Sequence, residues 1–172
     1  MRRIVIFAVV CSLLLLSCEN VQDANTQKVK TEKATQPKAK KSAKKKPEKK
    51  NDPQVYKEAL KAEITDVNGK LPVQVEPGVT VTKFTVEDND AVYYYMCDES
   101  IVNMSALRQS QEKMKTGTLA SLKTTRDPET LHLLMMLRKG EMGLTYKYVG
   151  VKTGETILVQ YNPEEIKGLK SE

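Results

Sequence analysis

The sequence is poor in the side chains from which most catalytic and metal sites are built. It has one histidine, His132, and no tryptophan in 172 residues. A His-based catalytic triad, a HExxH zinc site and a multi-histidine metal site therefore lack their ligands. At 100° per residue, His132 shares a helix face with Lys139, away from Leu134 and Leu137. We expect it to lie at the surface in an ordinary role.

Cysteine is equally scarce. There are three cysteines and no CxxC motif, and two of the three, Cys11 and Cys18, belong to the first eighteen residues. Only Cys97 remains beyond them, and Asp98 and Glu99 follow it directly. Neighbouring negative charge disfavours the reactive thiolate. The sequence therefore predicts an inert thiol at a strand end and no disulfide.

Cofactor motifs are also missing. The acidic clusters Asp88-Asn89-Asp90 and Asp98-Glu99 are separated by a predicted seven-residue strand, which is roughly 20 to 25 Å long. They cannot share one cation, and the first lacks the Gly and distal Glu of a calcium loop, so we interpret it as a turn. The eight glycines occur singly, and no phosphate-binding loop is indicated. We predict no metal, no cofactor and no catalytic residue.

One long apolar run is present, and it lies at the N-terminus. Arg2 and Arg3 precede thirteen uncharged residues, 4–16, which is typical of a secretory signal and shorter than the roughly 20 residues that span a bilayer. The segment Leu15-Leu16-Ser17-Cys18 resembles the lipobox of bacterial lipoproteins. The resemblance implies that residues 1–17 are a signal peptide and that Cys18 becomes the acylated first residue. An ordinary signal peptide with an incidental cysteine is the alternative.

Two or three acyl chains would make Cys18 a durable membrane anchor. By resemblance to lipoprotein sorting in enteric bacteria, Glu19 is not the aspartate associated with retention in the inner membrane. The expected location is therefore the outer membrane, facing the periplasm.

The basic charge of the chain is concentrated in residues 18–51. This segment has eleven lysines, no aromatic residue and only two valines. It cannot form a core and should be an extended tether of roughly 30 Å root-mean-square length, or about 110 Å when stretched. The lysines either serve only to keep the tether hydrated and extended, or they attract anionic lipid or cell-wall polymer.

Residues 52–172 are net acidic, because 15 of the 28 basic and 18 of the 22 acidic residues lie there. A basic nucleic-acid-binding domain is therefore excluded, and export would remove nucleic acid as a partner of the tether. The segment has 121 residues, which is enough for one domain that folds without disulfides.

The pattern of residues 52–172 predicts an α+β fold. Asp52-Pro53, Asn103 and Asp127-Pro128 should each begin a helix, and a phase slip near Thr82-Lys83 indicates a β-bulge. The expected elements are a helix over 53–64, strands over 79–87 and 91–97, helices over 104–117 and 128–139, strands over 144–148 and 156–161, and a helical tail over 164–169. They predict a four-stranded antiparallel sheet made of two hairpins, with helices on one face.

This arrangement resembles a family of small exported bacterial α+β domains with no assigned activity. The resemblance spans about residues 64–166 and implies fold and envelope location. In the regions where that family has cysteines, this chain has Thr125 and Ile166, so no disulfide carries over. The residues that carry the resemblance are Asn68-Gly69-Lys70-Leu71-Pro72, Tyr93, Tyr95, Gly140, Tyr146-Lys147-Tyr148, Gly154 and Pro163-Glu164.

Tyrosine is the one enriched feature of the predicted strands. Tyr93 and Tyr95 share one strand face and Tyr94 takes the other, while Tyr146 and Tyr148 share a face. The tyrosines either line the edge of the core or form an aromatic sheet face that binds a glycan or a protein. The candidate binding residues are Tyr93, Tyr95, Tyr146 and Tyr148.

Together these features predict a lipid-anchored envelope protein that is not an enzyme and acts as an interaction module. A small envelope hydrolase acting on cell-wall or ester substrates is the alternative, although no assembled motif supports it. The sequence does not indicate an oligomeric state.

Overall fold

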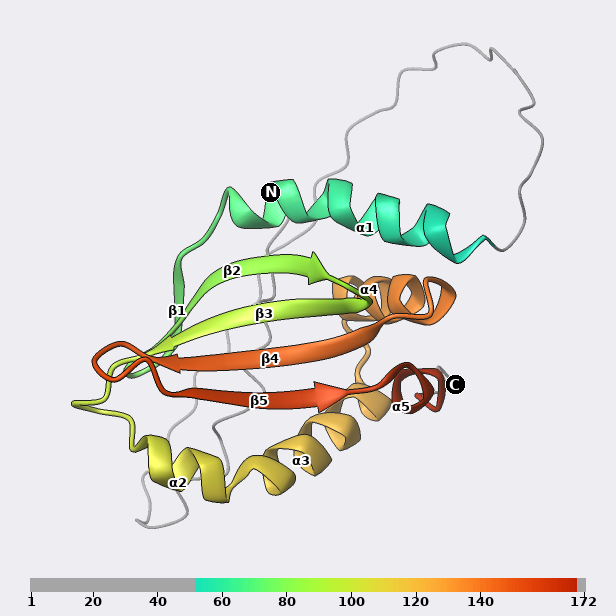
Figure 1. Ribbon diagram of the computed structural model, residues 1–172. Coiled ribbons are helices and arrows are strands. Elements are labelled where there is room, and N and C mark those ends of the chain that lie inside the picture. Colours follow the sequence, from blue (N-terminus) through green and yellow to red (C-terminus); the bar gives the residue numbers. More distant parts are fainter. Residues whose placement is uncertain (1–51, 170–172) are drawn as a thin grey trace, which may run out of the picture.

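The computed structural model describes residues 52–169 as one sheet and five helices (Figure 1). The strands are β1 (Val73–Glu76), β2 (Val79–Glu87), β3 (Asp90–Cys97), β4 (Gly143–Gly150) and β5 (Thr156–Tyr161). The helices are α1 (Pro53–Asn68), α2 (Met104–Gln109), α3 (Gln111–Thr124), α4 (Pro128–Lys139) and α5 (Pro163–Lys167). The predicted signal peptide, Cys18 and tether lie outside the described residues.

The α+β class is confirmed, but the predicted four-stranded antiparallel sheet is wrong. The sheet has five strands in the order β1-β2-β3-β4-β5, and β3 pairs with β4 in parallel. The helices α2, α3 and α4 carry the chain from the end of β3 back to its start, where Gly143 pairs with Asp90. A long helical crossover of this kind joins parallel strands, whereas a hairpin needs only a short turn. The first strand, β1, was not predicted. Its sequence Val-Gln-Val-Glu does alternate, but it has only four residues.

Helix starts follow the predicted capping chemistry. The carboxylates of Asp52 and Asp127 accept hydrogen bonds from Gln54 N (3.0 Å) and Thr130 N (2.7 Å), and Asn103 caps α2 in the same way. A side-chain acceptor at this position satisfies a backbone donor that has no partner within the helix. Three details differ from prediction. Helix α1 continues to Asn68, the helix that follows Asn103 is divided at Ser110, and its second part, α3, continues to Thr124.

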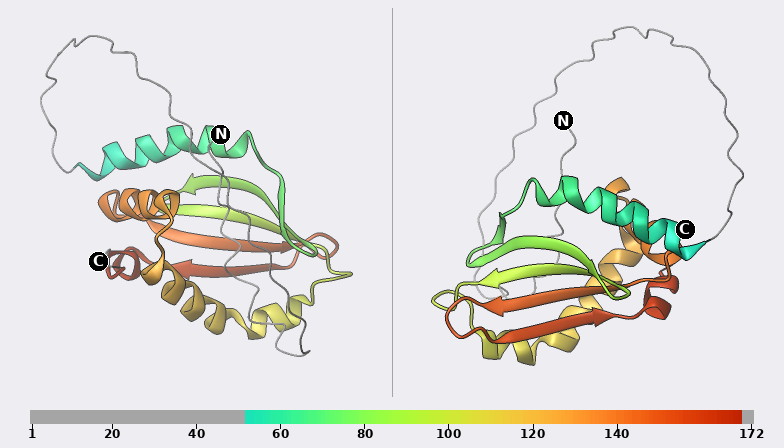
Figure 2. Two further views of the ribbon diagram at one scale, coloured as in Figure 1. Left: turned by 180° about the vertical axis from the view of Figure 1, so that it is seen from behind. Right: turned by 45° about the horizontal axis from the view of Figure 1, so that its top comes forward.

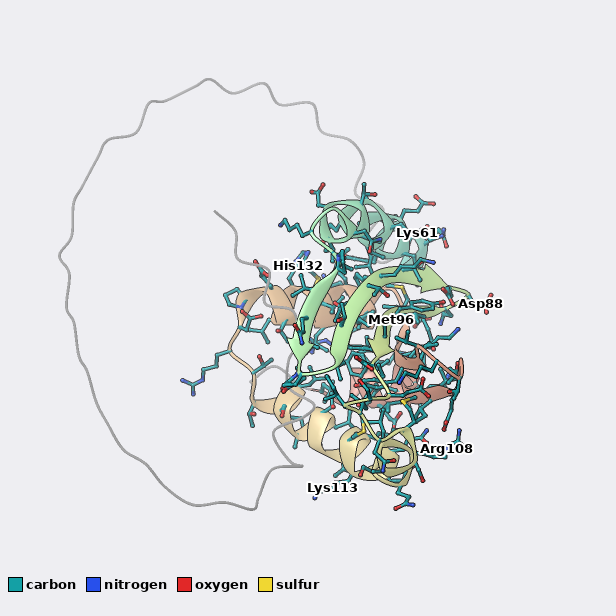
Figure 3. The ribbon with its side chains drawn as sticks, turned by 90° about the vertical axis from the view of Figure 1, so that its left-hand side faces the viewer. Lys61, Asp88, Met96, Arg108, Lys113 and His132 are labelled. Carbon is teal, nitrogen blue, oxygen red and sulfur yellow. The ribbon has the colours of Figure 1, made fainter. Side chains whose placement is uncertain are left out.

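The helices cover one face of the sheet. Seen from behind, α4 lies in front of one end of the strands (Figure 2), and α1 packs along β2 while α3 packs along β5. Leu60 and Ile64 of α1 and Leu134 and Leu137 of α4 join the core on this side. Viewed along the strands, the helices lie on one side of the sheet, and no described helix lies on the other (Figure 3). We call this second side the open face.

A β-bulge in β2 changes which of its side chains face the core. The pairing of β2 with β3 shifts between Val81 and Lys83, which confirms the bulge expected there. The bulge lets Val81 and Phe84 both point into the core although they are three residues apart. Beyond β1, the side chain of Asn68 pairs with the backbone of Phe84, donating to its carbonyl and accepting from its N–H at 2.8 Å each. Asn68 thus takes the place of a neighbouring strand.

Candidate functional site

The strand register places the open-face side chains in rows that run across the sheet. Lys83 pairs with Tyr94, Tyr94 with Lys147, and Lys147 with Leu158. The rows on either side of this one are Thr80, Met96, Val149 and Thr156, and Thr85, Val92, Thr145 and Gln160. Val92 and Thr145, in the second row, are each only 4% exposed. The open face therefore has one row with positive charge between two rows dominated by threonine and aliphatic side chains.

The centre of the open face is a tyrosine between two lysines. The Nζ atoms of Lys83 and Lys147 lie 5.1 Å and 4.9 Å from the centroid of the Tyr94 ring. An ammonium group at this distance is attracted to the face of an aromatic ring. We call these three residues the Lys–Tyr–Lys cluster. Among residues 52–169, neither lysine has a carboxylate within ion-pair distance.

The two carboxylates of the open face are both used as hydrogen-bond acceptors. The hydroxyl of Tyr94 donates to Glu87 Oε1 at 2.5 Å, and Thr145 Oγ1 donates to Asp90 Oδ2 at 2.8 Å. The hydrogen bond to Glu87 raises the pKa of Tyr94, because the carboxylate accepts the phenolic proton. The acids are thus held within the protein, while the two ammonium groups remain available to an external anion.

The candidate tyrosines predicted from the sequence lie on the other side of the sheet. Tyr95, Tyr146 and Tyr148 are 3%, 2% and 3% exposed, and Tyr93 is partly buried against the same core. Tyr146 sits at their centre, with its ring centroid 5.8 Å from that of Tyr93 and 5.9 Å from that of Tyr95. Their burial gives these four residues a packing role. Of the two alternatives that strand parity left open, the one that exposes Tyr94 is correct.

Burial controls the ionisation of the core tyrosines. It raises the pKa of Tyr146 well above its ordinary value and raises the pKa of Tyr161 to about 12. It also raises the pKa of Tyr93. The phenolate form is disfavoured because burial removes the charge from water.

The single histidine and Cys97 occupy the positions that the sequence predicts. The His132 side chain is 49% exposed and its Nε2 lies 3.0 Å from Glu63 Oε1, which links α4 to α1. Cys97 is 0% exposed, at the end of β3. Neither residue lies on the open face.

The acidic residues after β3 fasten loops together. Glu99 accepts hydrogen bonds from Lys152 N (2.5 Å), Thr153 N (3.0 Å) and Thr153 Oγ1 (2.7 Å), and these bonds lower the pKa of its carboxyl. They connect the loop after β3 to the turn between β4 and β5. Within residues 52–169, no three His, Cys, Asp or Glu side chains come together as a metal site. In the same range, no helix has the length and apolarity needed to cross a bilayer.

Sequence reasoning did not identify Lys83, Tyr94 and Lys147 as a cluster. Two signals were present. The bulge at Thr82-Lys83 puts Lys83 on the same face of the sheet as Tyr94. On β4, Lys147 lies between Tyr146 and Tyr148 and therefore points to the opposite face from them. Because a lysine is rarely buried, a strand with a lysine between two tyrosines is expected to turn the lysine to solvent and both tyrosines to the core. The pairing of β3 with β4, which unites the cluster, has no local signal.

A solved structure with a similar fold is known at low sequence identity. No family model and no curated protein matches it. A protein of Pseudomonas aeruginosa described as secreted aligns with a TM-score of 0.53 and 14% identity, over 70% of this chain and 99% of that one. Two pilotins of type 2 secretion systems, from Vibrio vulnificus and Vibrio cholerae, align with TM-scores of 0.45 and 0.43 and identities of 9% and 7%. They cover 66% and 65% of this chain and 93% of each pilotin.

Proposed function

We propose that the protein is a lipid-anchored, non-catalytic binding module of the bacterial envelope, held by Cys18 on the outer membrane and binding its partner through the open face. The observation that carries the proposal is the Lys–Tyr–Lys cluster at the centre of a sheet face that no described helix covers. An uncovered sheet face with aligned functional side chains is a surface that can bind without moving any element of the fold.

The geometry favours binding over catalysis. The open face is formed by rows of side chains on four paired strands, so its shape is set by the backbone ladder. It combines two cations, an aromatic ring and hydroxyl groups, which recognise a ligand. The one imidazole, in His132, pairs with Glu63 on the helix side, and the Cys97 thiol is buried.

The anchor and tether complete the proposal. Acylation at Cys18 would hold the chain at a membrane, and residues 19–51 would let the domain reach up to about 110 Å from it. A domain on such a tether can search the space beside the membrane for an immobile partner.

Site-specific photo-crosslinking in cells tests the binding surface. A photoreactive phenylalanine analogue replaces Gln160, an exposed open-face residue, or Lys113, an exposed residue of α3 that lies away from the open face (Figure 3). We expect Gln160 to give adducts, either with a protein of higher mass or with detergent-washed cell wall, and Lys113 to give none. Equal adducts from both positions, or none from Gln160, would refute the open face as the binding surface.

Metabolic labelling with a palmitate analogue tests the anchor. The variant Cys18→Ser lacks the thiol to which the lipid attaches, so we expect it to remain unlabelled and to leave the membrane fraction. A Cys11→Ser variant is the matched control and should be labelled like the wild type. Equal labelling of the Cys18→Ser variant would refute lipidation at this residue.

A further inference from the structure

The two lysines of the open face are positioned for more than one anionic group. They lie on β2 and β4 with β3 between them, and adjacent strands are about 4.8 Å apart, so their backbones are roughly 10 Å apart. Both ammonium groups rest on the ring of Tyr94 and have no carboxylate partner among residues 52–169. Because the two Nζ atoms lie 5.1 and 4.9 Å from the same ring centroid, they are at most about 10 Å apart, and a ligand with negative groups at intervals can pair with both.

The surroundings of the cluster are polar and hydrogen-bonding. Thr80, Thr85, Thr156 and Gln160 present hydroxyl and amide groups in the rows beside it. These groups can pair with the hydroxyls and amides of a hydrated polymer. The open face is therefore complementary to a ligand that is polar along its length and negative at intervals.

A large protein partner fits this face less well. Stable protein interfaces contain large apolar anchors that become fully buried at their centre. Among the described residues, the large apolar side chains exposed to solvent are Val55, Ile101, Val151 and Leu158, and only Leu158, 37% exposed, belongs to the open face. The other apolar side chains of this face, Met96, Val149 and Val92, are already half-buried or buried, so a protein partner would find fewer large exposed apolar groups here than a stable interface buries.

An anionic membrane surface also fits less well. Recognition of anionic lipid typically uses four to eight clustered lysines or arginines. Among residues 52–169, the open face has only two lysines, Lys83 and Lys147. The charge of this face is too small for that mode of binding.

We infer that the open face binds the carboxylate-bearing glycan–peptide polymer of the cell wall, with Lys83 and Lys147 each pairing with a carboxylate; the inference rests on the proposed envelope location. Tyr94 acts as a positioning residue, because its ring holds both ammonium groups above the sheet. Thr80, Thr85 and Thr156, in the rows beside the cluster, supply hydrogen bonds to the polymer.

Co-sedimentation with isolated cell-wall sacculi tests the inference directly. The processed chain is purified in detergent, and a second form lacks residues 24–50, because the tether lysines could bind the same polymer. In both forms Lys83→Gln with Lys147→Gln is compared with Lys113→Gln with Lys139→Gln. The control pair removes equal charge from the helix side, and Lys139 likewise lies over a tyrosine ring, that of Tyr56, at 5.2 Å.

In the form without residues 24–50, we expect the open-face pair of substitutions to weaken binding about tenfold and the control pair to change it less than about twofold. Sacculi whose carboxyl groups have been amidated should bind weakly to the wild type. A thermal melt of each variant shows whether it is folded before its binding is compared.

The positioning role of Tyr94 has its own readout. Tyr94→Phe keeps the ring and should bind sacculi like the wild type, whereas Tyr94→Leu keeps both lysines but removes the ring and should bind more weakly. Equal binding by these two variants would refute the positioning role.

The inference would be overturned by loss of all binding when residues 24–50 are removed, by equal effects of the two pairs of substitutions, or by unchanged binding to amidated sacculi. Stronger binding to phosphatidylglycerol vesicles than to sacculi would identify the membrane as the partner and would also overturn it. Because this assay uses purified protein, its outcome is independent of palmitate labelling in cells, and failure of the anchor can be told apart from failure of the binding site.

Discussion

The tyrosines of the central strands should separate into two classes when they are truncated. Tyr146→Ala removes a side chain that is 2% exposed and whose ring contacts those of Tyr93, Tyr95 and Tyr161 at centroid distances of 5.8, 5.9 and 5.7 Å. Truncating a buried aromatic residue costs about 3 to 5 kcal/mol, from lost burial and the cavity that remains. We therefore expect the free energy of unfolding to fall by about 4 kcal/mol, which lowers the Tm by roughly 15 °C in a domain of this size.

Tyr94→Ala is the matched substitution on the open face. It removes the contacts with Lys83 and Lys147 and the hydrogen bond to Glu87, all at a partly exposed position. Surface substitutions cost much less, and we expect about 1 kcal/mol or below.

Urea denaturation followed by circular dichroism, with linear extrapolation to water, measures both values. Tyr146→Phe keeps the ring and should stay near the wild type, which separates packing from the hydroxyl. The assignment of faces would be refuted if Tyr94→Ala cost as much as Tyr146→Ala. It would also be refuted if Tyr146→Ala cost less than about 1 kcal/mol.

Three more outcomes follow from particular contacts. Asn68→Ala leaves the backbone N–H and carbonyl of Phe84 without their side-chain partner, and chemical denaturation should show a loss of about 1 to 3 kcal/mol, whereas a neutral effect would contradict the strand-replacing role of Asn68. Because folding raises the pKa of Tyr161 to about 12 from an ordinary value near 10, the stability it contributes is present below pH 10 and is lost as the pH rises through 12. Tyrosinate absorbance should therefore rise together with unfolding, and complete titration of all tyrosines in a folded protein would refute this. Deleting residues 24–50 should leave the Tm unchanged, because a segment with almost no apolar side chains adds nothing to a core; a drop of many degrees would place the domain boundary elsewhere.

Local chemistry predicted the elements of this fold well. Asp52, Asn103 and Asp127 each cap a backbone N–H only two or three residues further along the chain. The bulge beside Lys83 interrupts the alternation of apolar residues. Both features can therefore be detected in a short stretch of sequence. The orientation of β4 relative to β3 is different, because it depends on how three intervening helices pack.

The same limit applies to the proposed binding surface. Lys83, Tyr94 and Lys147 come from three strands, and their contact requires the parallel register of β3 with β4. The tyrosine pattern named Tyr93, Tyr95, Tyr146 and Tyr148 as candidate binding residues, and these lie in or against the core. Lys147 indicates which face is which. A charged side chain stays in solvent, so the alternating residues Tyr146 and Tyr148 point into the core.

The parallel pair at the centre of the sheet also sets the order in which the chain can fold. β2 with β3 and β4 with β5 are neighbours in the sequence, whereas Asp90 and Gly143 are 53 residues apart when they pair. Closing a loop of that length costs roughly 2 kcal/mol more chain entropy than closing a turn of five residues. The two hairpins should therefore form early, and their joining through β3 and β4 should limit the rate. Substitutions along that seam would then slow folding, while substitutions in β1 would mainly speed unfolding.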